Sequence, residues 1–225
     1  MSKTKAHTIY RSKIKKFKNG NGIIFPGVTT IVDVLNKPAL VPWANKIGLQ
    51  GIEVRKYVDD KADIGTLGHA MVIDRLLNRP TDTEDYSQNQ IDAAENACLS
   101  FFEWQKKHHL KIISAEQPLV SEKYEFGGQY DIFGLIDNIA ELLDLKTGSG
   151  IWEEHYYQLG GYLILLEENG TYPQQFRILN IPRSEDENFQ EVVISGRIME
   201  LAKEMFLDCL SIYKRKKEVR SLLKR

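Results

Sequence analysis

The chain has 225 residues, a mass of 25.9 kDa and a net charge of −1, and its 42% hydrophobic and 27% charged residues are typical of a single folded domain. It has no apolar run of about 18 residues and no apolar signal-peptide core near its start, so we expect no membrane span and a cytoplasmic location. Its two isolated cysteines, Cys98 and Cys209, support neither a disulfide framework nor a zinc site, and they cannot supply the four thiolates of an iron–sulfur cluster.

Positive charge gathers at both ends of the chain. Residues 1–18 hold seven Lys or Arg and no acid, and residues 214–225 hold another seven with only Glu218 against them. Such ends either contact a phosphate backbone or are solvated termini, and the sequence leaves both interpretations open. Lys214 and Arg215 are the candidates for nucleic-acid contact in the second run.

The first part of the chain predicts a hairpin followed by short helices. The doubled Asn-Gly signal at residues 19–22 predicts a turn within residues 8–25. Thr29 or Thr30 is expected to cap a helix that runs through Leu35, and another helix is expected to open at Leu40. We therefore expect residues 1–60 to form a helical cap region.

Two longer helices are expected next. Gly65 begins a pattern that runs to about Asn78, and a broad apolar face predicts a helix from about Gln90 to Lys107. His69 points inward on the first of these helices, because it shares a stripe with Val72, Ile73 and Leu76. The residue pattern alone favours a hydrogen-bonded core histidine over a metal ligand.

Residues 111–116 and 119–126 are expected to be strands that lead into the centre of the sequence. Glu116 ends the first strand and is a metal ligand, a buried structural carboxylate or an exposed rim residue; these alternatives stay open. The pair Gly127-Gly128 permits a tight turn or a close backbone approach.

The centre of the sequence predicts a β-hairpin. Two apolar runs, Gln129–Ile136 and Ile139–Lys146, flank Asp137-Asn138, which suits a two-residue turn. If the turn is those two residues, counting back along both strands places Asp131 opposite Asp144, with their Cβ atoms about 5 Å apart.

This hairpin would bring like charges together at its open end. Lys146 shares the face of Asp144, because side chains alternate along a strand. Two facing carboxylates destabilise a sheet unless one is protonated or a cation lies between them. An oxygen-seeking ion such as Mg²⁺ or Mn²⁺ would remove the conflict.

A glycine-rich loop and a helix follow the hairpin. Thr147 and Ser149 lie in the loop, which would let a phosphate backbone come close. In the helix expected from Trp152 to Glu168, Gln158 and Tyr162 are four residues apart and share one face. Gly160-Gly161 between them is expected to let this helix approach the sheet.

The last part of the chain predicts two strands, 175–181 and 189–195, and a terminal helix that starts at Gly196. The inward residues of this helix are expected to be Ile198, Leu201, Ala202, Met205 and Leu210. The fold class is therefore α/β, with a central mixed sheet of roughly five strands and helices on both faces. We expect one domain over residues 1–225, with the 1–60 cap and a 61–225 core.

The ordered set Asp131, Asp144-Leu145-Lys146 and Gln158 with Tyr162 resembles the PD-(D/E)XK nuclease superfamily in its RecB-like and phage-type exonuclease branch. Gly65-Thr66 three residues before His69 is similar to the same branch. The resemblance implies a restriction-endonuclease-like core and a DNA exonuclease of phage or mobile-element origin, dependent on Mg²⁺ or Mn²⁺ and acting in recombination or end processing.

The resemblance also implies roles for single residues. Asp131, Asp144 and Lys146 would be catalytic, supported by Gln158 and Tyr162, and His69 would join both aspartates in the metal site. Glu116 resembles an acidic residue that some members carry on the strand before the metal-binding Asp, which implies that it could be a further metal ligand. The resemblance implies DNA as the partner and leaves open a homo-oligomer and a single-strand annealing protein.

Two other functions stay open on the sequence. The first is a non-cleaving nucleic-acid-binding or assembly protein on a nuclease-like fold. The second is an unrelated Mg²⁺ hydrolase acting on nucleotides, although the chain lacks a Gly-rich phosphate loop of the Walker type.

Overall fold

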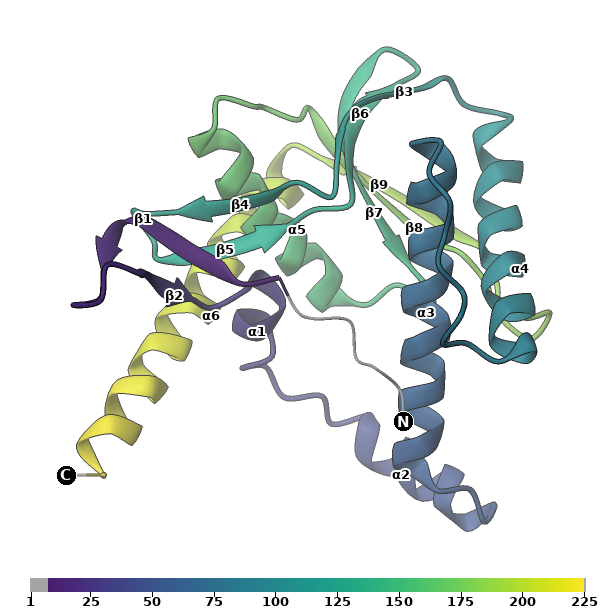
Figure 1. Ribbon diagram of the computed structural model, residues 1–225, viewed down its shortest axis with the longest axis horizontal. Coiled ribbons are helices and arrows are strands. Elements are labelled where there is room, and N and C mark those ends of the chain that lie inside the picture. Colours follow the sequence, from purple (N-terminus) through teal and green to yellow (C-terminus); the bar gives the residue numbers. More distant parts are fainter. Residues whose placement is uncertain (1–7, 225) are drawn as a thin grey trace.

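A five-stranded mixed sheet forms the centre of the computed structural model, which describes residues 8–224. The strand order is β3-β6-β7-β8-β9; β7 and β8 are parallel and every other pair is antiparallel. Helices cover both faces (Figure 1), so the predicted α/β class and mixed sheet are confirmed. The strands are β3 Leu110–Ala115, β6 Ile132–Ile136, β7 Ile139–Lys146, β8 Gln175–Asn180 and β9 Gln190–Ser195.

The central hairpin has the predicted register. Asp137 and Asn138 have φ angles of 50° and 71°, as a type I′ turn requires at both central positions. Ile136 pairs with Ile139, and Ile132 pairs with Leu143. Asp131 directly precedes Ile132, and its carboxylate accepts a hydrogen bond from the Leu145 N–H, so it lies beside the end of β7 that carries Asp144.

Side-chain alternation along the strands builds a separate core on each face of the sheet. Leu142 and Phe176 pack with α5, α6 and α1, whereas Leu143 and Leu179 pack with α3 and α4. Figure 1 shows the two helix layers on opposite sides of the sheet. The helices are α1 Val28–Val32, α3 Val54–Leu76, α4 Gln88–Gln105, α5 Glu153–Glu168 and α6 Arg197–Leu222.

Two small sheets stand beside the main one. The predicted N-terminal hairpin is present as β1 and β2, and β4 pairs with β5. Tyr10 of β1 lies against Gly127, where a Cβ atom would come within 2.4 Å of the Tyr10 Cβ. The predicted close backbone approach at Gly127 is therefore real. The strands are β1 Tyr10–Lys16, β2 Gly22–Phe25, β4 Pro118–Ser121 and β5 Phe126–Gln129.

Helix α2, Leu40–Leu49, has no buried residue. No helix within residues 8–224 combines the length and apolarity needed to cross a membrane. Residues 1–7 and Arg225, which belong to the two basic runs, lie outside the described part of the chain.

Several predicted boundaries are wrong. Gln129–Ile136 is not one strand, because the chain bends at Tyr130-Asp131 and divides it between β5 and β6 in different sheets. Helix α3 begins at Val54 rather than Gly65, so one continuous helix runs through residues 60 and 61, where we expected the cap to meet the core. Helix α1 has Gly27 at its N-cap, and neither Thr29 nor Thr30 caps it.

Two packing predictions are also wrong. In α6, Ile198 and Leu201 are exposed, and the buried residues are Met199, Ala202, Phe206, Cys209 and Leu210. Gly160 and Gly161 bring α5 close to α6 and not to the sheet. A Cβ at Gly160 would lie 2.2 Å from the Ala202 carbonyl oxygen, and one at Gly161 would lie 2.7 Å from the Phe206 ring.

Candidate active site

The end of β7 supplies a buried carboxylate and a partly buried lysine. Asp144 is 2% exposed and Lys146 lies two residues further on the same face. The Asp144 Oδ2 is 2.7 Å from the Lys146 Nζ but receives no hydrogen bond of good geometry from any described group. This oxygen is therefore a buried acceptor with unused capacity.

Asp131 lies at the bend before β6 and is held by two donors. The His69 Nε2 is 2.9 Å from the Asp131 Oδ1. The Leu145 backbone N–H donates to the Asp131 Oδ2 at 2.7 Å, which ties the carboxylate to β7. His69 therefore reaches the predicted cluster from α3, but as a hydrogen-bond partner of the first aspartate.

Glu116 lies at the rim of the same cluster. Its backbone has a φ of 48°, and its N–H donates to the Asp131 carbonyl oxygen at 2.9 Å. Its carboxylate is 3.9 Å from the His69 Nδ1 and 3.2 Å from the Arg79 guanidinium. Sequence reasoning missed Arg79, because a single arginine in a polar loop carries no signal of a distant partner.

Helix α5 contributes the two residues that its spacing predicted. Gln158 Oε1 accepts a hydrogen bond from the Lys146 Nζ at 3.1 Å, so this glutamine fixes the lysine head group. Tyr162 is buried in the core one turn further along, beside Gly128, where a Cβ would come within 2.9 Å of its ring. Gly128 thus makes room for the tyrosine.

Burial and charge act against each other on the two aspartates. Burial raises the pKa of Asp144, Lys146 opposes this and Asp131 adds to it, with the result that the pKa is about 6. Burial also acts to raise the pKa of Asp131, but His69, Lys146 and the Leu145 N–H outweigh it and hold the pKa below its usual value. Asp131 is therefore the more acidic member of the pair.

The pKa values of the basic residues His69 and Lys146 are raised, although burial acts to lower them. Burial lowers the pKa of His69, but Asp131, Glu116 and Asp144 outweigh it and leave the pKa raised. For Lys146 the attraction of Asp144 and Asp131 likewise outweighs burial, so its pKa is raised and its charge is retained. Burial, followed by the two aspartates, raises the pKa of Tyr162 well above its usual value, so its phenol keeps its proton.

The carboxylate oxygens of the cluster are of the type that binds a divalent ion, but they are not arranged around a common point. Carboxylate oxygens are the ligands that Mg²⁺ and Mn²⁺ prefer, and Asp144 Oδ2 has unused acceptor capacity. Within residues 8–224, however, no group of three or more His, Cys, Asp or Glu side chains is arranged to hold a metal. His69 and Asp131 instead contact each other, with the His69 Nε2 at 2.9 Å from the Asp131 Oδ1.

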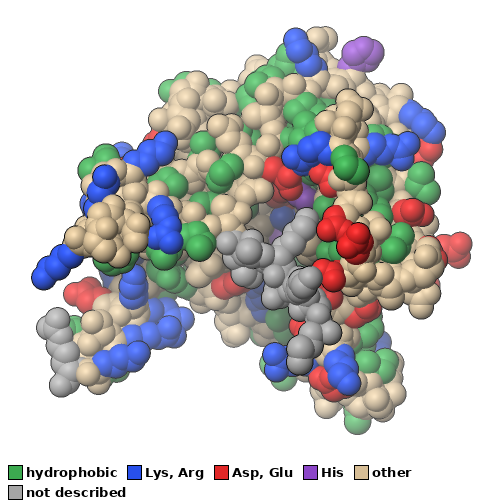
Figure 2. Space-filling view, viewed as in Figure 1, with side chains coloured by type: hydrophobic (Ala, Val, Ile, Leu, Met, Phe, Trp, Pro, Cys, Tyr) green, Lys and Arg blue, Asp and Glu red, His purple; other side chains and the backbone are tan. Residues whose placement is uncertain are grey.

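The cluster opens into a cleft of about 460 Å³ between α3 and the end of β7. Lys146, Thr147, His69 and Glu116 line it, and so do Lys61 and Thr66 of α3, which sequence reasoning did not select. In the space-filling view the molecule is hollowed on this side (Figure 2). The predicted loop residue Ser149 is exposed beyond the cleft.

Side chains of β8 and β9 form hydrogen bonds with the backbone of the loop that follows β7. Asn180 Nδ2 donates to the Gly148 carbonyl oxygen at 3.0 Å, and the Ile151 N–H donates to Gln190 Oε1 at 3.0 Å. Sequence reasoning missed both side chains, since each comes from a strand more than thirty residues away. The two contacts give Thr147 and Ser149 a fixed backbone.

Lys214 and Arg215 do not lie in this cleft. Both are exposed on α6, and Lys214 is paired with Glu125 at 3.4 Å. They belong to an arm made of β1, β2 and the end of α6, on which Lys and Arg side chains gather (Figure 2).

Known structures give distant similarities. A protein from Eubacterium rectale described as a "Putative exonuclease" is 12% identical, with a TM-score of 0.43 over 64% of this chain and 63% of that one. An alkaline exonuclease from Laribacter hongkongensis is 11% identical, with a TM-score of 0.37 over 88% of this chain and 94% of that one. The same exonuclease in complex with dAMP has a TM-score of 0.38 at 11% identity, over 89% and 95%. No protein-family model and no curated protein matches the sequence, so the function has to be argued from the side chains of the site.

Proposed function

We propose that the protein is a metal-dependent DNA nuclease. The observation that carries the proposal is the meeting of Asp131, Asp144 and Lys146 at the open end of one hairpin, with Gln158 holding the lysine from α5. Two buried carboxylates beside a charged lysine are costly to stability, and a hydrolytic site is a reason to keep them.

Asp131 and Asp144 would hold Mg²⁺ or Mn²⁺, with His69 and Glu116 as further ligands. A bound ion would polarise the scissile phosphate and lower the pKa of the attacking water. For His69 to serve as a ligand through Nε2, it has to give up its hydrogen bond to the Asp131 Oδ1. Asp144 Oδ2 accepts no hydrogen bond of good geometry, and its one close partner is the Lys146 Nζ at 2.7 Å, so this oxygen has acceptor capacity left for an ion.

Lys146 supplies the fixed positive charge. Its Nζ lies between Asp144 and Gln158, so its position is set before substrate arrives. A cation held in this way stabilises the negative charge that builds on the phosphate during attack, and it can orient the water. Tyr162, protonated and buried behind the aspartates, would support their positions.

The finer features of the proposal come from the resemblance to RecB-like and phage-type nucleases. They are exonuclease action, a phage or mobile-element origin and a role in recombination or end processing. Thr147 and Ser149 would contact the DNA backbone beside the cleft, and Lys214 and Arg215 would contact it from the basic arm.

The test is incubation of the purified protein with end-labelled linear DNA and with covalently closed circular DNA, in Mg²⁺, in Mn²⁺ and in EDTA. We expect loss of the linear DNA alone, only with metal; nicked circles would indicate an endonuclease instead. Lys146→Ala should reduce the rate roughly 10²-fold or more, whereas Lys111→Ala, an exposed lysine on β3, should not. Full activity of folded Lys146→Ala would refute the assignment.

One observation favours a second candidate, a non-cleaving nucleic-acid-binding protein. His69 and Asp131 satisfy each other, and the described residues hold no ready-made metal site. DNA that stays intact under every metal condition, together with a gel shift that survives EDTA, would favour this candidate.

A further inference from the structure

A groove of about 530 Å³ lies between α1 and the last turns of α6, separate from the catalytic cleft. Four cations in the last turns of α6 and just beyond its end line it, with Thr30 of α1 and the C-cap residue Asp33 on the other wall. The cations are Lys216, Lys217, Arg220 and Lys224.

The four cations carry unneutralised charge. No carboxylate within residues 8–224 forms an ion pair with any of them, and the one acid that lines the groove, Asp33, is 3.6 Å from the Lys37 Nζ. Lys214 differs, because it is paired with Glu125 and lines a neighbouring groove, which shares Lys217 and Ser221 with this one. A wall of unpaired cations is costly in self-repulsion and is typical of a surface that binds a polyanion.

The spacing of these residues fits an extended backbone better than a single phosphate. Residues 216–224 span about 12 Å of helix at 1.5 Å per residue, which matches three to four phosphates at about 3.4 Å of rise each. Thr30 and Ser221 add hydroxyl donors to the groove.

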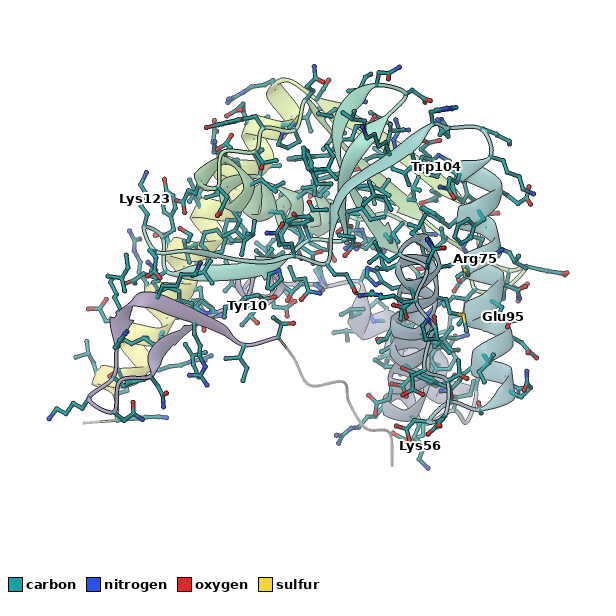
Figure 3. The ribbon with its side chains drawn as sticks, turned by 45° about the horizontal axis from the view of Figure 1, so that its top comes forward. Tyr10, Lys56, Arg75, Glu95, Trp104 and Lys123 are labelled. Carbon is teal, nitrogen blue, oxygen red and sulfur yellow. The ribbon has the colours of Figure 1, made fainter. Side chains whose placement is uncertain are left out.

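The charge of the whole molecule favours the same side. Residues 80–105 hold six acids and no Lys or Arg, whereas residues 11–18 hold five Lys or Arg and no acid. The acidic segment includes α4, where Glu95 lies far from Tyr10 on the basic arm (Figure 3). A polyanion is thus attracted to the arm and repelled from α4.

The groove also adjoins the element that carries part of the catalytic cluster. Lys37 follows α1 and lies 3.6 Å from Glu154 in the first turn of α5, the helix that bears Gln158. Lys37 also pairs with Asp33 on the wall of the groove, so this lysine links the groove to α5.

We infer that the groove between α1 and α6 is a second phosphate-binding surface, which holds the backbone of a DNA duplex away from the cleavage site. The inference rests on the proposed function in that the ligand is the DNA that the catalytic site would cut. It also assigns the arm's main contacts to Lys216, Lys217 and Arg220 rather than to the paired Lys214.

The test measures binding of a labelled duplex of about 30 base pairs over a series of salt concentrations, in EDTA so that no cleavage occurs. The triple variant Lys216→Ala/Lys217→Ala/Arg220→Ala should bind about tenfold or more weakly at roughly 0.1 M salt, and its salt slope should fall by about 2 to 3. The matched control Lys56→Ala/Lys107→Ala/Lys111→Ala removes the same charge from exposed lysines outside the groove that pair with no carboxylate within residues 8–224, and should bind as the wild type does.

The outcomes separate this inference from the nuclease proposal. If the affinity of the triple variant and that of the control depend equally on salt, the groove does not bind DNA, even if the wild type degrades DNA. A wild type that does not bind the duplex would also contradict the inference. A reduced slope in the triple variant alone supports the groove, even if no protein cleaves DNA.

Discussion

Asp144 carries a negative charge that its surroundings oppose. Its pKa is raised to about 6, chiefly by burial and despite the nearby Lys146. A carboxyl group whose pKa is higher in the folded than in the unfolded state costs stability as pH rises from about 4 to 6, and the full cost remains above that range. At pH 8 the ionised form is therefore a burden on the fold.

Asp144→Asn should abolish cleavage and stabilise the protein. Removing the charge should raise the free energy of unfolding at pH 8 by on the order of 1–3 kcal/mol, and the gain should vanish below about pH 4. Urea denaturation in EDTA at both pH values measures this. If the variant is less stable than the wild type at pH 8, the attraction between Asp144 and Lys146 contributes more to stability than the burial of the Asp144 charge costs.

His155, whose pKa Lys146 helps to lower, should make the stability of the folded protein sensitive to acid. Its Nδ1 accepts the Trp152 N–H at 3.1 Å, so the neutral ring carries its proton on Nε2. Burial, then Lys146 and Lys37, lower its pKa to about 3. The unfolded chain takes up a proton below about pH 6.5 and the folded chain does not, so this stability is complete above pH 6.5 and is lost towards pH 3.

His155→Gln should remove that part of the pH dependence, because a glutamine oxygen can still accept the Trp152 N–H. Between pH 7.5 and pH 5.5 the wild type should lose about 1 kcal/mol more stability than the variant. Denaturant titrations at the two pH values provide the measurement, with the exposed His109→Gln as control. An unchanged pH dependence in His155→Gln would show that His155 is protonated in the folded protein.

At the level of helices, α5 and α6 approach each other through glycine. A Cβ at Gly160 would meet the Ala202 carbonyl oxygen at 2.2 Å, and that atom is backbone and cannot rotate away. Gly160→Ala should therefore force the helices apart and cost about 1–3 kcal/mol or more. The change should appear as a lower urea midpoint.

Gly48→Ala is the matched control, because a Cβ there would meet no atom within 4 Å on the exposed helix α2. The added helix propensity should stabilise the protein by up to about 1 kcal/mol. If both variants lower the midpoint equally, close packing of α5 on α6 is not the cause.

The elements that the sequence predicted well depend on local signals. The turn at Asp137-Asn138 fixes its own register, and the spacing of Gln158 and Tyr162 fixes their common face. This is why the meeting of Asp131, Asp144 and Lys146 could be predicted.

The remaining features arise from distant contacts. The helical stripe Val54, Tyr57 and Ile64 is interrupted by Lys61, so the start of α3 left only a weak periodic signal. The bend at Asp131 exists because β5 pairs with β4 and not with the main sheet. The pairing of Arg79 with Glu116 and the contact of Gly160 with α6 each join elements that only the tertiary fold brings together.

At the scale of the whole molecule, the N-terminal region belongs to the main core. Val28, Ile31 and Val32 of α1 are among the most buried residues and pack with α5 and α6. The backbone of Gly27 forms a bridge with Gly127, and α3 continues through residue 60. These contacts couple residues 27–60 to the rest of the chain.

A fragment of residues 61–225 should therefore fail to fold by itself, whereas a chain that ends at Tyr213 should keep its fold, because every residue from 214 to 224 is exposed. Circular dichroism and thermal unfolding test both truncations, and the full chain should unfold in one cooperative transition. The chain ending at Tyr213 also loses the groove cations, so it should retain its thermal stability and lose duplex affinity together with salt dependence. A stable, cooperative 61–225 fragment would instead mean that α1 docks on a core that is complete without it.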